Sequence, residues 1–225
     1  PITDDPDATR AWYIDEPKIE PVKLGDWIGD VKKGSGVNFY NIQFNPHAHG
    51  THTETAGHVL SERHSINKNL NRYFFWAELV TLTPKKMDED LVMDLELIKA
   101  CVKHTTEALI IRTTPNNDDK RRRNYSESNP PYLTAESLSW LRERGVKHLL
   151  IDLPSVDKEQ DGGEVAAHHA FWNTKSNTRL DATITELIYV PNEIEDGIYF
   201  MNLQVAAFEN DAAPSRPMLF SLLKH

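Results

Sequence analysis

One thirteen-residue segment, Pro46–His58, holds four of the ten histidines of this 225-residue chain. It reads Pro-His-Ala-His-Gly-Thr-His-Thr-Glu-Thr-Ala-Gly-His, so its side chains include His47, His49, His52, Glu54 and His58. Imidazole is the side chain most often found as a metal ligand, and it is the usual acid or base near neutral pH. The composition therefore predicts a divalent metal that activates a water molecule. The alternative is a polar surface loop whose histidines bind nothing.

Spacing within this segment decides which side chains can meet. Gly50 and Gly57 allow the backbone to bend tightly. Residues two apart in an extended strand share a face, so we expect His52, Glu54 and His58 to point the same way. His49 would lie opposite them unless the chain reverses direction at Gly50.

A zinc or manganese ion needs more ligands than this segment supplies. Three later stretches offer them: the acidic run 152–157, the doublet His168–His169, and Glu186. Glu186 interrupts an otherwise apolar strand-like stretch, and a buried carboxylate is costly unless it is paired or ligated. The alternative for Glu186 is the exposed side of a half-buried strand.

The elements that must position these residues follow from hydrophobic periodicity. We predict strands at 37–44, 73–83, 108–113, 147–153, 183–190, 198–206 and 217–223, and helices at 88–104 and between Thr134 and Gly145. The alternation of strands and helices from 73 to 153 favours parallel or mixed pairing through crossovers. We therefore predict an α/β fold with one domain over residues 1–225, preceded by an irregular segment at 1–20.

Composition restricts the functional classes. Hydrophobic residues make up 39% of the chain, enough for one substantial core. Lys and Arg total 25 against 34 Asp and Glu, and the net charge of −9 argues against nucleic acid as the main ligand. The basic run 120–123 is interpreted as a solvated loop. The single cysteine, Cys101, excludes an intrachain disulfide and predicts a reducing, cytoplasmic location. No stretch approaches the roughly 18 apolar residues that span a membrane.

The motif around His52 resembles that of a known family. Gly50-Thr51-His52-x-Glu54-x-x-x-His58 is similar to the signature His-x-Gly-Thr-His-x-Asp-x-x-x-His of the cyclase family, which includes the bacterial kynurenine formamidases (arylformamidases). Two further motifs follow downstream in the order found in the family. The first is the stretch from Tyr132-Leu133-Thr134 to Gly145-Val146, and the second is the strand end Leu150-Ile151-Asp152-x-Pro154-Ser155-x-Asp157. The agreement extends over roughly residues 20 to 220.

The resemblance implies a compact α/β fold around a mixed, barrel-like sheet, assembled as dimers or tetramers. It implies a one- or two-metal site, most often zinc with manganese as an alternative, that hydrolyses a small-molecule amide. The reference activity is the hydrolysis of N-formylkynurenine in tryptophan catabolism. No nucleic acid or membrane partner is implied.

Carried over by position, the resemblance makes His52 and Glu54 metal ligands and His58 the acid/base. His168 or His169, together with Glu186, completes the shell. Of the doublet we favour His168, because Phe171 and Trp172 then fall where the family has two apolar residues after the ligand.

Three departures from the family pattern affect the site. The first family histidine falls on Ala48, so that His47 or His49 would have to replace it through a shifted backbone. Glu54 replaces Asp, and the interval from His168 to Glu186 is longer than is usual in the family. Ala48 favours the alternative of an inactive family member with a binding or assembly role. A metal-dependent lyase or dehydratase is the other alternative.

Four aromatic residues on predicted strands remain to be placed: Tyr40, Phe74, Phe75 and Trp76. They could form an aromatic wall for a substrate, although aromatic residues on strands more often belong to the core.

Overall fold

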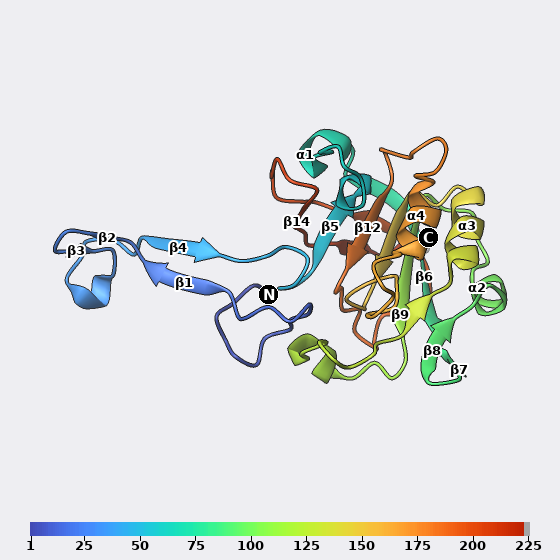
Figure 1. Ribbon diagram of the computed structural model, residues 1–225, viewed down its shortest axis with the longest axis horizontal. Helices are drawn as coiled ribbons and strands as arrows, with labels where there is room; N and C mark the ends of the chain where they lie inside the picture. Colours follow the sequence, from blue (N-terminus) through green and yellow to red (C-terminus); the bar gives the residue numbers. More distant parts are fainter. Residues whose placement is uncertain (223–225) are drawn as a thin grey trace.

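Eight strands form the central sheet of the computed structural model, which describes residues 1–222 (Figure 1). In sheet order they are β14 (Ala212–Pro214), β5 (His52–Thr55), β12 (Thr183–Glu186), β11 (His148–Ile151), β9 (Ala108–Thr113), β6 (Phe74–Leu82), β13 (Gly197–Asn202) and β15 (Met218–Phe220). The four middle strands run parallel, and the two at each side are antiparallel to their neighbours. The sheet curls into a half-barrel, which confirms the predicted α/β fold with a mixed, barrel-like sheet.

Both faces of the middle strands are covered. Every residue of β9 and β11 is buried, as expected for parallel strands that read as nearly continuous apolar runs. Three helices pack on one face: α2 (Leu95–Cys101), α3 (Ala135–Glu143) and α4 (Ala166–Trp172). A second apolar cluster, which includes Phe75, Ile110 and Met201, fills the other face. The short helix α1 (Ile66–Asn69) follows β5 and the 3₁₀ turn η2 (Ala56–His58).

Local signals located α3 correctly but misplaced the start of α2. The Thr134 hydroxyl accepts a hydrogen bond from Ser137 N, and Gly145 ends the helix with φ +87°. The predicted helix 88–104 is wrong in its first part. There β8 (Asp90–Met93) pairs with β7 (Lys85–Met87) and β10 (Tyr132–Leu133), and this pairing overrides the helical spacing of the apolar residues.

The basic run 120–123 is only partly solvated. It lies in the 3₁₀ turn η3 (Asp118–Arg122) and at Arg123, and its three arginines are exposed. Lys120 is buried, contrary to the prediction, and its Nζ donates to Asp152 Oδ2 at 2.7 Å and to Thr113 O at 2.6 Å. The buried carboxylate of Asp152 requires a cation, and Lys120 supplies it.

Residues 18–43 project from the domain as a separate N-terminal arm (Figure 1). Its base is the hairpin of β1 (Lys18–Pro21) and β4 (Tyr40–Gln43), and its tip contains β2 (Lys23–Leu24), β3 (Trp27–Ile28) and the turn η1 (Val31–Lys33). The strand predicted at 37–44 therefore exists at 40–43, but it does not join the central sheet. The irregular segment predicted at 1–20 ends earlier, where β1 begins.

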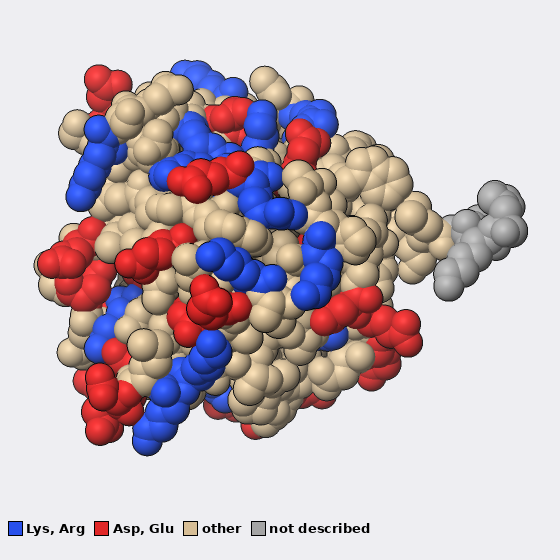
Figure 2. Space-filling model, turned by 90° about the vertical axis from the view of Figure 1, so that its right-hand side faces the viewer, with Lys and Arg blue, Asp and Glu red and all other residues tan. Residues whose placement is uncertain are grey.

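The surface opposite the arm is charged without a dominant sign. Figure 2 shows Lys and Arg side chains interspersed with Asp and Glu over this face. Within residues 1–222, no helix is long and apolar enough to cross a bilayer.

Candidate metal centre

Two neighbouring strands bring the candidate ligands together. Strands β5 and β12 pair antiparallel, with His52 opposite Glu186 and Glu54 opposite Ile184. Because side chains alternate along a strand, His52, Glu54 and Glu186 all project to the face that α4 covers. All three are buried. Gly50, with φ +146°, adopts a backbone conformation that favours glycine just before β5.

His52, Glu54 and Glu186 form a first group of candidate ligands. In this group, His52 directs one ring nitrogen toward the two carboxylates. Its Nδ1 lies 3.0 Å from Gly50 O, a contact in which the nitrogen donates. Its Nε2 lies 3.4 Å from Glu186 Oε2 and 4.0 Å from Glu54 Oε2. A backbone carbonyl that fixes one nitrogen in this way leaves the lone pair of the other free for a metal.

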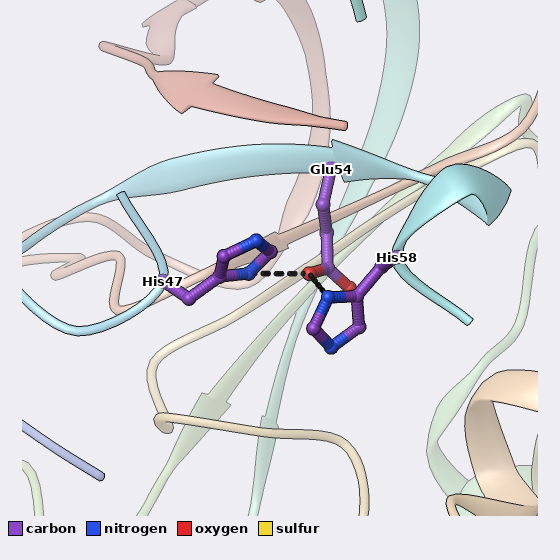
Figure 3. A group of neighbouring side chains, drawn as sticks. All are labelled: His47, Glu54 and His58. Atoms are coloured by element: carbon purple, nitrogen blue, oxygen red, sulfur yellow. Dashed lines mark ion pairs between the residues drawn. The ribbon is translucent and has the colours of Figure 1, made fainter. Parts of the chain in front are cut away.

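The second group shares Glu54 and adds two rings (Figure 3). His47, from the loop before β5, places Nδ1 3.1 Å from Glu54 Oε2, and His58, from η2, places its Nδ1 3.9 Å from the same oxygen. The two rings are stacked with centroids 4.3 Å apart. Gly57 permits this turn, because a Cβ there would lie 2.6 Å from His64 O. The side chain of His58 is 33% exposed, so it lies at the solvent side of the cluster.

Of the two histidines beside Ala48, the structure brings only His47 to Glu54. His49 is buried elsewhere, and both of its ring nitrogens have partners. Its Nδ1 accepts from Asn45 N at 2.9 Å, and its Nε2 donates to Asp15 O at 2.8 Å. In this structure His49 ties the N-terminal segment to the domain, and neither of its ring nitrogens is free for a metal.

The histidine doublet divides in the same way. His168 is buried, and its Nε2 lies 3.1 Å from Glu54 Oε1 and 3.6 Å from Glu186 Oε1. Its Nδ1 lies 2.5 Å from Asp157 Oδ2, and Asp157 also accepts the backbone N–H groups of Ala167 and His168. His169 points away to Thr174 Oγ1, because consecutive residues of a helix occupy different faces. Of the two alternatives, the structure therefore brings His168, and not His169, to the carboxylates.

Two acidic residues contact the histidines of the cluster: Asp157, from the acidic run expected to offer ligands, and Asp211, which was not predicted. Asp211 Oδ2 lies 2.8 Å from His47 Nε2 and 3.5 Å from His58 Nδ1. It stands immediately before β14, and the pairing of β14 with β5 brings it there. No local pattern indicates Asp211, whereas Asp157 lies in the run 152–157 that was expected to offer ligands, and here it orients the ring of His168. Asp152, of the same run, pairs instead with Lys120.

Charges within the cluster reinforce one another. Burial opposes the charge of Glu54, but His58 and the contacts with His168 and His47 hold its pKa well below its usual range. Burial likewise opposes protonation of His47, and its contacts with the carboxylates of Asp211 and Glu54 outweigh this effect, raising the pKa of His47 to about 10. For His168, contacts with Asp157, Glu186 and Glu54 overcome burial and raise the pKa well above its usual value. The buried carboxylates therefore give the cluster a negative electrostatic potential, which favours the binding of a cation.

Among residues 1–222, three buried polar atoms of the cluster form no hydrogen bond of good geometry: His47 Nδ1, His52 Nε2 and Glu54 Oε2, although His47 Nδ1 and Glu54 Oε2 lie 3.1 Å apart as an ion pair. Leaving a buried donor or acceptor unpaired costs about 1–3 kcal/mol. These atoms belong to the two groups of candidate ligands, His52–Glu54–Glu186 and His47–Glu54–His58. Within each group, the potential ligand atoms lie within 4.8 Å of one another. Two imidazole nitrogens and a carboxylate oxygen are the donors that zinc and manganese take. The residues present therefore fit a divalent metal.

Comparison with known proteins agrees with this architecture. The Cyclase family matches residues 4–158, and the chain belongs to that family. A kynurenine formamidase of Bacillus cytotoxicus is 26% identical over 209 residues, which cover 88% of this chain and 91% of that protein.

Solved structures share the fold at low identity. A potential metal-dependent hydrolase with cyclase activity superposes with a TM-score of 0.69 at 16% identity, covering 97% of this chain and 93% of that one. An isatin hydrolase bound to the product analogue thioisatinate superposes with a TM-score of 0.64 at 14% identity, and the match covers 94% of this chain and 87% of that one.

Proposed function

We propose that this protein is a metal-dependent hydrolase of small amides, linear or cyclic, with an arylformamidase-like activity. The observation that carries the proposal is the buried convergence of ring nitrogens and carboxylate oxygens at His47, His52 and Glu54, three of whose atoms form no hydrogen bond of good geometry among the described residues. The formamidase relative and the isatin hydrolase fold support amide substrates. Zinc is the proposed ion and manganese the alternative. A cytoplasmic location is proposed from the single cysteine.

Five side chains would hold the metal: His47, His52, Glu54, His168 and Glu186. When bound there, a divalent ion lowers the pKa of water and polarises a carbonyl oxygen. Three of the ligand rings are oriented through their second nitrogen, His52 by Gly50 O, His168 by Asp157 and His47 by Asp211. Such outer contacts fix the ring orientation and increase the basicity of the ligand.

His58 is the proposed proton carrier. It is the most exposed histidine of the cluster, so its ring is accessible to a substrate. Its Nδ1 lies 3.5 Å from Asp211 Oδ2, and this carboxylate would stabilise the ring while it holds a proton. The ring would take a proton from the attacking water and return it to the leaving nitrogen, a role that contributes about 10²–10⁴-fold in rate.

The position of His47 bears on the rival role of an inactive family member. That rival rested on Ala48, the residue that replaces a family ligand. The ring of His47 reaches Glu54 from the neighbouring position, so the cluster does not lack an imidazole on that side. A lyase or dehydratase would use the same residues but would not consume water.

The proposal is tested with metal-restored protein and a panel of N-formyl aryl amides, cyclic imides and lactams. We expect turnover that incorporates ¹⁸O from labelled water, and a loss of at least about 100-fold in kcat for His58→Gln. His64→Gln is the matched control, because among residues 1–222 the ring of this nearby half-buried histidine forms an ion pair only with Glu62, and the variant should retain activity. Inactivity on the whole panel, turnover without ¹⁸O, or full activity of His58→Gln would overturn the proposal.

A further inference from the structure

A cleft of about 590 Å³ lies on the face of the sheet opposite the metal centre. Its apolar wall includes Ile110 and Leu150, which belong to the second apolar cluster. The candidate metal ligands of strands β5 and β12 project to the other face, the one that α4 covers. Small-molecule sites in proteins are concave and typically enclose about 300–1,000 Å³. The cleft therefore has the size of a ligand site and lies on a different face from the metal centre.

The curl of the half-barrel shapes this cleft. Residues 215–217 connect β14 to β15, the two end strands of the sheet, and all three line the cleft. Leu219 of β15 also lines it, as do Ile188 and Val190 from the segment that follows β12. These three aliphatic side chains pack in the second apolar cluster. The wall is therefore fixed by the core and does not need a ligand to form it.

The lining is aliphatic rather than aromatic. Tyr189 is the only aromatic residue among the described residues that line the cleft. Of the four aromatic residues considered for a substrate wall, Phe75 is in the core, and the other three are exposed on strands outside the cleft: Tyr40, Phe74 and Trp76. A single ring offers little surface for stacking, so an aliphatic ligand body fits this wall better than a flat ring system.

Two arginines give the cleft a positive rim. Arg121, from η3, and Arg216, from the connection between β14 and β15, line it and are exposed. The Arg121 guanidinium lies over the Tyr189 ring, 5.5 Å from its centroid. Among residues 1–222, neither guanidinium pairs with a carboxylate, whereas Arg72 and Arg112 do. No Asp or Glu is among the described residues that line the cleft, so the rim favours an anion.

Two acidic side chains near the cleft have partners of their own. Asp152 pairs with Lys120, whose side chain also lines the cleft. Asp118 accepts a hydrogen bond from the Tyr189 hydroxyl at 2.9 Å. The positive charge of the two rim arginines is therefore left for a ligand.

We propose that this cleft binds a small aliphatic monocarboxylate. Its chain would lie on the apolar wall, and its carboxylate would pair with the guanidinium groups of Arg121 and Arg216. Charge-assisted hydrogen bonds from guanidinium to carboxylate are shorter and stronger than neutral ones. The basic run 120–123 then has two tasks, because Lys120 neutralises Asp152 in the interior while Arg121 binds the ligand. Binding requires no turnover, so this site is independent of the proposed hydrolase activity.

The first test is isothermal titration calorimetry of the metal-restored protein with octanoate and with octan-1-ol, a neutral analogue of the same chain length. We expect octanoate to bind at least about tenfold more tightly, because hydrogen bonds to charged groups contribute more than neutral ones. From hexanoate to decanoate, affinity should rise about fourfold for each methylene that is buried. Treatment with a chelator should leave these affinities unchanged, because none of the candidate metal ligands is among the described residues that line the cleft.

Substitution of the rim tests the charge. Arg121→Gln/Arg216→Gln should weaken octanoate binding at least about tenfold and leave octan-1-ol binding unchanged. Arg122→Gln/Arg123→Gln is the matched control, because it removes the same net charge at two exposed arginines of the basic run that lie outside the lining. The control should bind octanoate as wild type does.

A larger side chain tests whether the probes enter the cleft. Leu219→Trp should occupy the space along the apolar wall and abolish measurable binding of both probes. Ile194→Trp, which also alters the lining, replaces this variant if it does not fold.

Several results would overturn the proposal. No measurable binding of octanoate would do so, and it is the result expected if a second copy of the chain covers the cleft. Octanoate binding that is lost on chelation would place the probe at the metal centre instead. The proposal also fails if octanoate binds no more tightly than octan-1-ol, if both arginine pairs change its affinity equally, or if the tryptophan variant binds it as wild type does.

Discussion

Glu54→Gln gives the sharpest test of the metal centre, because Glu54 belongs to both groups of candidate ligands. The substitution keeps the shape of the side chain and removes its charge. A ligand that binds only the folded state at 100 times its Kd stabilises that state by about 2.7 kcal/mol. For a chain of 150–250 residues, 1 kcal/mol moves Tm by about 2–4 °C, so zinc or manganese should raise the wild-type Tm by about 5–11 °C. We expect Glu54→Gln to lose most of this rise.

The assay is thermal unfolding of chelator-treated protein with and without added metal. Two pairs of histidines close in sequence provide matched controls. His47→Gln and His168→Gln should reduce the metal-induced rise, whereas His49→Gln and His169→Gln should retain it, because the rings of His49 and His169 contact other groups. The reasoning is refuted if Glu54→Gln responds to metal as wild type does, or if His49→Gln and His169→Gln lose the response.

Three further predictions concern stability. Lys120→Met leaves Asp152 buried without its cation and should cost about 3–5 kcal/mol in denaturant unfolding, while exposed Arg121→Met should cost little. Thr134→Ala removes the N-terminal cap of α3 and should cost about 1 kcal/mol in the same measurement; an unchanged midpoint would contradict the role of the cap. Burial lowers the pKa of His148 to about 4, so between pH 6.5 and 4 the unfolded chain binds a proton that the folded chain does not. The free energy of unfolding should therefore fall by about 1.4 kcal/mol for each unit by which the pH is lowered through that window. His148→Leu should remove this contribution, and equal pH slopes in the variant and the wild type would disprove it.

Local patterns predicted the parts of the site that depend on local geometry. The two-residue period of a strand places His52 and Glu54 on one face, and the same period places Glu186 beside them once β12 pairs with β5. The capping residue and the terminal glycine located α3 for similar reasons. The sequence also contained the acid that orients His168, although its role became clear only from the contact itself.

Long-range contacts account for what the sequence did not predict. Asp211 reaches His47 only because β14 pairs with β5, far away along the chain. The choice of His47 over His49 depends on a loop that turns His49 toward Asp15. The strand β8 replaces the start of a predicted helix, because its partners β7 and β10 decide its conformation. Neither a period nor a propensity encodes such partners.

The antiparallel pairing of β5 with β12 also makes ion binding sensitive to strand alignment. A slip of one residue between these strands would turn Glu186 to the far side of the sheet and separate it from His52. Misaligned chains would then lack the complete set of donors, so a metal would select the correctly aligned molecules during folding. Metal content would thereby report the fraction of a preparation that has reached the native strand alignment.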